Sequence, residues 1–130
     1  MAPTLESELL DLTRRLLQAI TTGDWDTYQL LCDRSLTAFE PEACGQLVSG
    51  IEFHRFYFGL GRPSGNINTT MVAPHVRLLG PDAAVVSYVR LTQSVGDDGR
   101  PRSACCEETR VWQRQDGQWL HVHFHRSPRP

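Results

Sequence analysis

The N-terminal half of the chain shows a helical spacing of hydrophobic residues. Leucine and isoleucine recur every three or four positions between residues 5 and 20, which predicts an amphipathic helix over residues 5–22. Thr4 can cap the start of this helix, and Gly23 can end it. Asp24 can cap a second short helix, and the aromatic residues within 51–58 predict a third. A brief extended piece is expected at residues 36–39.

Beyond residue 68 the hydrophobic pattern changes to the alternation that is typical of β-strands. Runs rich in valine and aromatic residues are separated by turns that contain glycine, proline and aspartate. Pro74 lies within the first run and predicts a bulge or a sheet edge, because proline donates no backbone hydrogen bond. Asp116 and Gly117 predict a tight hairpin. The predicted strands cover residues 69–79, 83–94, 102–115 and 118–126.

Helices followed by antiparallel strands predict an α+β fold in which the helices cover one face of a curved sheet. Residues 59–66 contain several glycines and are predicted to form a loop between the two halves. The chain has 130 residues, 40% of them hydrophobic, and shows no internal repeat. We therefore expect one globular domain over residues 1–130.

The charge balance and the cysteines narrow the possible partners and compartments. With 13 basic and 15 acidic residues the net charge is −2, which does not favour nucleic acid as a partner. Every basic residue is an arginine, which excludes chemistry that needs a lysine. No apolar run approaches the ~20 residues of a membrane span, and the N-terminus lacks the basic region of a signal peptide. We therefore expect a cytoplasmic protein whose cysteines are reduced, namely Cys32, Cys44, Cys105 and Cys106.

Three histidines alternate along the last predicted strand. Strict alternation predicts that one face carries Leu120, Val122, Phe124 and Arg126 toward the interior, and that the other carries His121, His123 and His125. Neighbouring histidines on one face lie ~6.8 Å apart, so three of them converge poorly on one metal ion. No cysteine or carboxylate with ligand spacing accompanies them. We interpret them as structural or interface residues and expect no metal.

Three arginines are predicted to share strand faces with aromatic and aliphatic residues: Arg90, Arg110 and Arg126. One such arginine is typical of a side chain whose charge reaches solvent. Three on neighbouring strands indicate either a buried ion-pair network with Glu108 or Glu40, or a pocket that receives an anion. The residues themselves leave both interpretations open.

Six segments, in order along the chain, resemble one family. They are residues 36–43, 53–58, 88–93, 99–102, 107–112 and 122–126. Together they resemble the association (hub) domain of calcium/calmodulin-dependent protein kinase II, from about residue 9 to residue 127. Several collinear segments are a far more specific signal than one short motif.

The resemblance implies an NTF2-like cone, in which a curved antiparallel sheet wraps around the long N-terminal helix and encloses a pocket. It also implies that the chain is its own main partner, through dimers that join into a closed ring of twelve or fourteen subunits. In the kinase such a ring tethers catalytic domains. Because no kinase domain precedes Thr4, we expect a non-enzymatic hub without a cofactor, either excised from a kinase or free-standing.

The resemblance further implies a ligand site. The positions that match His54, Arg90, Arg110 and Arg126 line a pocket that accepts small carboxylates, and a regulatory peptide is a further candidate ligand. NTF2-like cones also host isomerases and dehydratases, whose general base is often a carboxylate or a His–carboxylate pair. A free-standing carboxylate-binding protein or enzyme, with His54 and either Glu40 or Glu108 as that pair, is therefore the alternative function.

Overall fold

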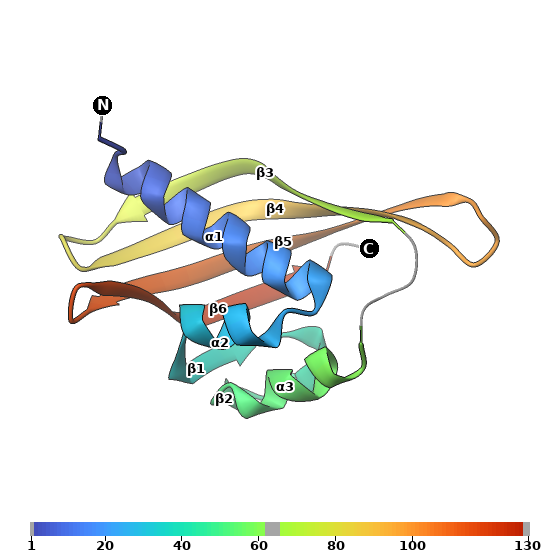
Figure 1. Cartoon of the computed structure of the whole chain (residues 1–130), viewed down its shortest axis with the longest axis horizontal. Helices are drawn as coiled ribbons and strands as arrows, with labels where there is room; N and C mark the ends of the chain where they lie inside the picture. The colour runs from blue at the N-terminus through green and yellow to red at the C-terminus, as the bar shows by residue number, and fades with distance from the viewer. Residues whose placement is uncertain (1, 62–65, 129–130) are drawn as a thin grey trace.

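A computed structural model describes residues 2–61 and 66–128 as helices packed on one face of a six-stranded sheet (Figure 1). The strand order is β2-β1-β6-β5-β4-β3. The helical elements are α1 (Leu5–Thr22), α2 (Trp25–Leu31), the 3₁₀ turn η1 (Pro41–Ala43) and α3 (Glu52–Gly59). The strands are β1 (Cys32–Phe39), β2 (Val48–Ser49), β3 (Ile67–Leu78), β4 (Ala83–Val95), β5 (Pro101–Gln115) and β6 (Gln118–Pro128). The α+β prediction is confirmed.

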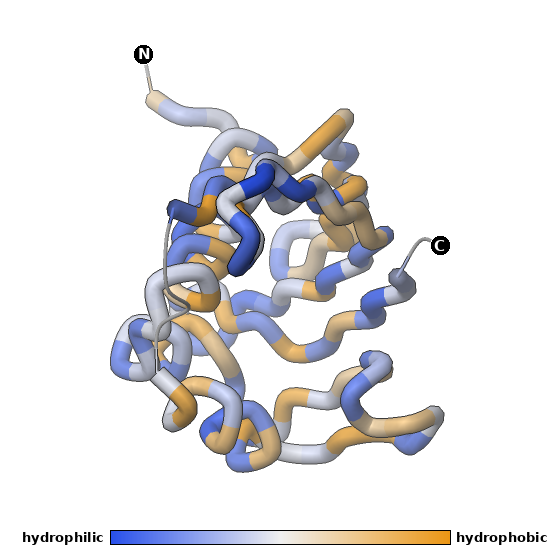
Figure 2. The backbone as a smooth tube through the Cα atoms, turned by 90° about the vertical axis from the view of Figure 1, so that its right-hand side faces the viewer, coloured by the Kyte–Doolittle hydropathy of each residue, from blue (hydrophilic) through white to orange (hydrophobic). Residues whose placement is uncertain are grey.

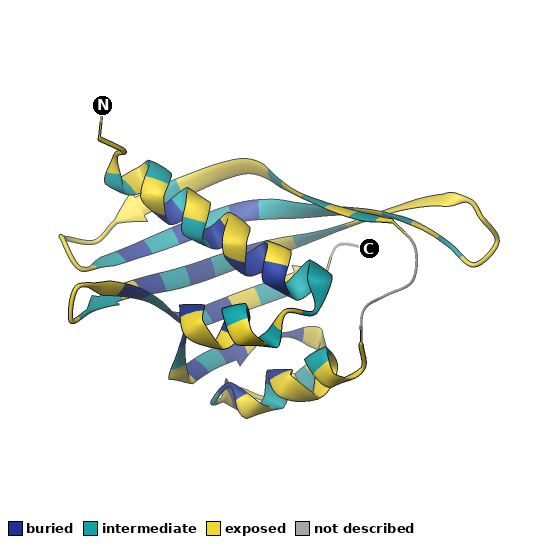
Figure 3. Ribbon diagram, viewed as in Figure 1, coloured by how far each residue is buried: buried dark blue, intermediate teal, exposed yellow. Residues whose placement is uncertain are grey.

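Helix α1 has the predicted limits because its two caps are those of the sequence pattern. The Thr4 hydroxyl accepts a hydrogen bond from the Ser7 amide at 3.1 Å, and Gly23 ends the helix with φ at +70°. One stripe of α1 is buried against the sheet while the opposite stripe is exposed (Figure 3). The helix crosses the concave side of the sheet and contacts β3, β4 and α2.

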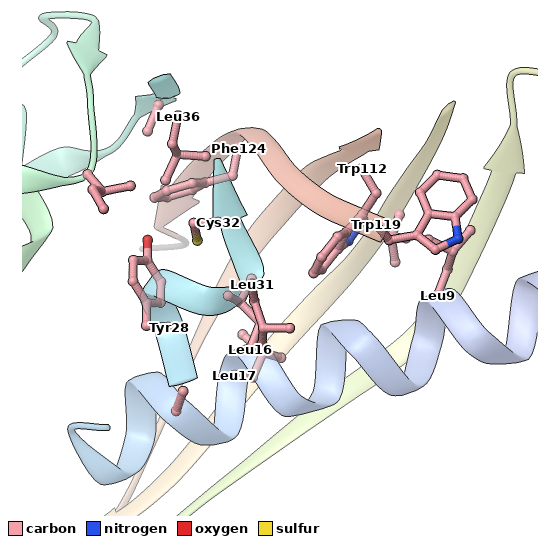
Figure 4. Packing of buried hydrophobic residues seen from close by; sticks show 14 of the residues in the cluster. Leu9, Leu16, Leu17, Tyr28, Leu31, Cys32, Leu36, Trp112, Trp119 and Phe124 are labelled. Atoms are coloured by element: carbon pink, nitrogen blue, oxygen red, sulfur yellow. The ribbon is translucent and has the colours of Figure 1, made fainter. Parts of the chain in front are cut away.

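The core has one end that is densely apolar. Trp112 and Trp119 pack near Leu9 at the N-terminal part of α1, whereas Tyr28 and Phe124 lie toward its C-terminal part (Figure 4). Hydrophobic and hydrophilic residues alternate along the strands in the perpendicular view (Figure 2). This alternation places one row of side chains of each long strand under the helices.

The sheet confirms the prediction for Pro74 and departs from the sequence predictions at β1 and β2. Pro74 lies on β3 at the edge of the sheet, and the register shifts between Val72 and His75, so the position is both a bulge and an edge. Strand β1 begins at Cys32 rather than at residue 36 and pairs with β6 in parallel, while β2 has only two residues and was not predicted. The predicted loop over 59–66 includes residues 62–65, which lie outside the described residues.

The predicted alternation along β6 was wrong for its first half. Val111 pairs with His123 but Trp112 pairs with His121, so β6 carries one extra residue, Val122, at a bulge. The bulge reverses which side chains face inward before it. His121 is therefore fully buried, while Phe124 and Arg126 keep the predicted orientation and His125 is exposed.

A buried hydrogen bond joins α1 to the sheet and gives a test of this packing. The Thr13 hydroxyl, fully buried, accepts from the Trp112 indole at 3.1 Å. Thr13→Val keeps the shape but leaves the indole donor unpaired, so we expect it to lower the free energy of unfolding by ~1–3 kcal/mol. Thr22→Val, at an exposed hydroxyl on the same helix, should change it little. Urea denaturation measures both, and equal effects would contradict the assignment.

Candidate functional site

A cavity of about 160 Å³ opens between α3, the C-terminal end of α1 and the sheet. Its walls come from every layer of the fold, because α1, α2, α3, η1 and strands β4, β5 and β6 each contribute a side chain. The lining residues are Ile20, Tyr28, Glu40, Glu42, His54, Tyr57, Phe58, Arg90, Arg110, Phe124 and Arg126. Five of the six residues singled out in the sequence are thus at one cavity, and the sixth, Glu108, lies buried behind the arginines.

Arg110 is the centre of the polar network beside the cavity. Its guanidinium is 3.1 Å from the carboxylate of Glu108, donates through Nε to the Tyr88 hydroxyl at 2.8 Å, and lies 4.5 Å from the centre of the Phe124 ring. The side chain is 1% exposed. An arginine this deep is stabilised only when its donors are paired, and here they are paired on several sides.

Glu108 accepts from three groups at once. The Tyr88 hydroxyl donates to it at 2.6 Å, and Arg90 and Arg110 lie 3.3 and 3.1 Å away. Burial by itself raises the pKa of Glu108, but the two guanidiniums outweigh it and lower the pKa to about 2. Glu108 is therefore a buried, permanently ionised counter-ion of two arginines at neutral pH.

His121 is part of the same network, which the sequence alternation did not indicate. Its Nε2 lies 3.4 Å from Arg110 Nη1, and its Nδ1 lies 3.5 Å from Cys32 Sγ. A guanidinium only donates hydrogen bonds, so Nε2 is the acceptor and the ring proton is on Nδ1. Burial, with the charge of Arg110, holds the pKa of His121 well below its ordinary value, so the ring is neutral. His121 thus positions Arg110 without adding charge.

Two further pairs line the cavity. His54 Nε2 is 3.1 Å from Glu40 Oε2, and both side chains are buried. Arg126 forms an ion pair with Glu42 of η1. No sequence pattern singles out Glu42, because it lies 84 positions from its partner on a turn of three residues without periodicity.

The charges around the cavity are more nearly balanced than the sequence indicated. The sequence indicates two carboxylates, Glu40 and Glu108, against the three arginines, and Glu42 adds a third. Among the residues that the structure describes, two buried nitrogens at the site have no hydrogen-bond partner, Nδ1 of His54 and Nε of Arg90. Leaving such atoms unpaired in the interior costs free energy.

The other two histidines of β6 lie on the outer side of the sheet, where His123 Nδ1 is 2.7 Å from the hydroxyl of Thr37. Within residues 2–61 and 66–128, no three His, Cys, Asp or Glu side chains lie close enough together to hold a metal ion. The four cysteines are free thiols. None of the helices in the described part of the chain is long and apolar enough to cross a bilayer.

Comparison with solved structures defines the class of the fold. An NTF2-like protein from Cytophaga hutchinsonii superimposes with a TM-score of 0.81 at 20% sequence identity, covering 98% of this chain and all of the other. A helix-lined cavity on the concave side of a curved sheet, with this topology, is the NTF2-like α+β cone.

Within that class the family is specific. The model of the calcium/calmodulin dependent protein kinase II association domain matches residues 5–130, and the chain belongs to this family. The association domain of the C. elegans kinase superimposes with a TM-score of 0.90 at 47% identity, covering 94% of both chains. The delta subunit of the rabbit (Oryctolagus cuniculus) type II kinase is 50% identical over 127 residues. The match covers 96% of this chain but spans about a quarter of that relative, 24% of its length.

The buried network makes the stability of the protein depend on pH. The pKa of Glu108 is lower in the folded state than its ordinary value of 4.5, so its stabilisation is complete above that pH and is lost as the pH falls toward 2. Glu108→Gln leaves two buried guanidiniums without their anion, and we expect a loss of ~3–5 kcal/mol at pH 7. Its unfolding free energy should then vary less than that of the wild type over this acid range.

Chemical denaturation at a series of pH values measures both effects. The control is Glu52→Gln, which removes a carboxylate that is 75% exposed and paired with Arg55 on α3, and it should keep the wild-type dependence on pH. A Glu108→Gln variant with the wild-type acid dependence would show that another carboxylate is responsible.

Proposed function

We propose that this chain is a self-association hub whose dimers join into a closed ring and hold other domains or partners together in the cytoplasm. The observation that carries the proposal is the family match over residues 5–130, nearly the whole chain. Closed rings arise when a two-fold contact between subunits is combined with a lateral contact that repeats. In such a role the chain itself is not an enzyme.

The surface supports a role in assembly. Large apolar side chains remain exposed at Phe56 on α3 and at its C-cap Leu60, which are 65% and 68% exposed, and also at Leu30 and Leu47. Burial of such side chains between subunits is the main driving force of obligate interfaces. With a net charge of only −2, mutual repulsion opposes this little.

The rabbit relative is a subunit of a kinase, which makes a tethered kinase domain the first candidate partner for such a ring. A ring would hold several copies near one another and raise their effective concentration. A regulatory peptide is a second candidate partner.

Native mass spectrometry tests the assembly directly. We expect a dodecamer or larger ring, and a particle of about ten or more subunits supports the hub. Because apolar burial drives the contacts, the particle should survive moderate salt and EDTA. A dimer would favour a free-standing NTF2-like protein instead, and dissociation by EDTA in light scattering would point to a metal at the histidines of β6.

We propose as a second function that the cavity binds a small carboxylate through Arg90, Arg126 and His54, with Arg110 behind them. All three side chains line the cavity, and this supports the proposal. A guanidinium binds a carboxylate through two parallel hydrogen bonds, and such charge-assisted bonds are about twice as strong as neutral ones. No cofactor is needed.

The His54–Glu40 pair also has the geometry of a general base, which keeps an isomerase or dehydratase as the alternative. Arginines, which cannot accept a proton, dominate the rest of the cavity, and this favours binding over turnover. A turnover assay on every acid that binds distinguishes the two functions.

A thermal-shift measurement tests the carboxylate site. Acetate, glutarate or an aromatic acid should raise the melting temperature by ~5–10 °C at a hundredfold excess over Kd, and more at low ionic strength. Arg126→Leu should abolish the shift while keeping the oligomer, because an apolar side chain suits the adjacent Phe124. Arg14→Leu, at an exposed arginine paired with Asp11, should keep the shift. If no acid moves the wild-type curve, the arginines are structural.

A further inference from the structure

The ion pair between Glu42 and Arg126 lies between two pockets, here called hollows. One is the cavity of about 160 Å³ described above. The other has a volume of about 330 Å³ and is lined on its far side by Cys106 and Pro128. Glu42, Arg90 and Arg126 line both hollows. These three side chains therefore form part of the wall between the interior and the outer surface.

Glu42 differs from the other carboxylates of the site in how firmly it is held. The Glu108 side chain is fully buried and held by two arginines and a tyrosine, and Glu40 is 4% exposed beside His54. The side chain of Glu42 is 35% exposed, and that of Arg126 is 24% exposed. Ion pairs that remain in contact with water contribute little net energy, so this pair exchanges partners far more easily than the buried pairs.

The local backbone also permits Glu42 to move. It lies in η1, a single 3₁₀ turn of three residues. Two backbone hydrogen bonds hold the turn, from Ala43 to Glu40 and from Cys44 to Pro41, each at 3.1 Å. Neither involves the backbone of Glu42 itself, so its side chain can rotate away without breaking the turn.

We infer that Glu42 acts as a built-in competitor at the carboxylate site: it occupies Arg126 in the empty protein and is displaced by the ligand. The inference rests on the carboxylate-binding function proposed above. Glu42 contacts Nη2 of Arg126, and both edges on which a guanidinium can bind a carboxylate in bidentate geometry include Nη2. A ligand that binds the edge occupied by Glu42 therefore has to displace it. The measured affinity is then the intrinsic affinity reduced by the fraction of molecules in which Arg126 is free.

Displacement has a structural consequence as well. Because the pair lies in both linings, release of Glu42 removes part of the wall and joins the outer hollow to the inner cavity. The same residue thus sets the affinity of the site and its access. Occupied and empty proteins differ at η1, which contacts β6.

Three variants distinguish this competition from long-range repulsion by Glu42 and from a general effect of removing a negative charge. Glu42→Gln removes the competing charge, and we expect acetate and glutarate to bind about two- to fivefold tighter. Glu42→Asp keeps the negative charge but shortens the side chain by one methylene, which weakens its pairing with Arg126. If the effect of Glu42 were only long-range repulsion, the aspartate variant would bind like the wild type, whereas competition predicts a gain in that variant too. Asp11→Asn removes a charge from an exposed ion pair on α1 and should leave the affinity unchanged.

Isothermal titration calorimetry at pH 7 and low ionic strength measures these affinities, with native mass and circular dichroism as checks on folding. If both Glu42 variants bind an acid more tightly than the wild type, or if only these variants bind one, the result supports competition by Glu42. If the wild type binds an acid and both variants bind it equally well or more weakly, competition by Glu42 is wrong and the ion pair is structural. The proposed carboxylate site would still be supported. A gain in Glu42→Gln alone overturns competition in favour of simple repulsion. If neither the wild type nor any variant binds an acid, both the carboxylate site and the competition by Glu42 are contradicted. Should Glu42→Gln not fold, the aspartate variant decides.

Discussion

The ion pair between Arg110 and Glu108 is the constraint on which the interior of this cone depends. Two charged groups that are each no more than 1% exposed are stable only if nearly every donor and acceptor between them is used. The Tyr88 hydroxyl, the imidazole of His121 and a second guanidinium, that of Arg90, complete the set. Tyr88 and Arg90 lie on β4, and His121 lies on β6. The network therefore forms only when β4, β5 and β6 are in their native register.

This network divides one continuous sheet into an apolar end and a polar end. Along β5 the inward-facing residues change from Trp112 to Arg110 to Glu108, with no change in the alternation of the strand. Helix α1 covers the Trp112 end with leucines, whereas aromatic residues of α2 and α3 surround the arginine end. The core and the candidate site are therefore two parts of the same row of side chains on β5. A change that shifts β5 in one part also moves the residues of the other.

The near balance of charge around the cavity changes how a ligand would bind there. A pocket with unpaired arginines would attract any anion by charge alone. Here Glu40, Glu42 and Glu108 already accompany the arginines and His54, so a carboxylate has to exchange with an internal one. Such exchange favours ligands whose geometry matches the guanidinium over simple anions. The choice between ligands would then be made mainly at the most solvated ion pair of the site, Arg126 with Glu42.

The sequence determined the local structure and much of the site. Helix α1, its caps and the hairpin at Asp116–Gly117 follow from interactions within a few residues, and period-two alternation placed Arg90 and Arg110 inside. Glu42 and His121 were decided by the tertiary structure. Glu42 and Arg126 are 84 positions apart and meet only after the chain between them folds back, and a turn of three residues has no periodicity to read. His121 faces inward because one extra residue, Val122, bulges out of the β6 ladder, and the pairing partner on β5, rather than the alternation of β6, fixes where that bulge falls.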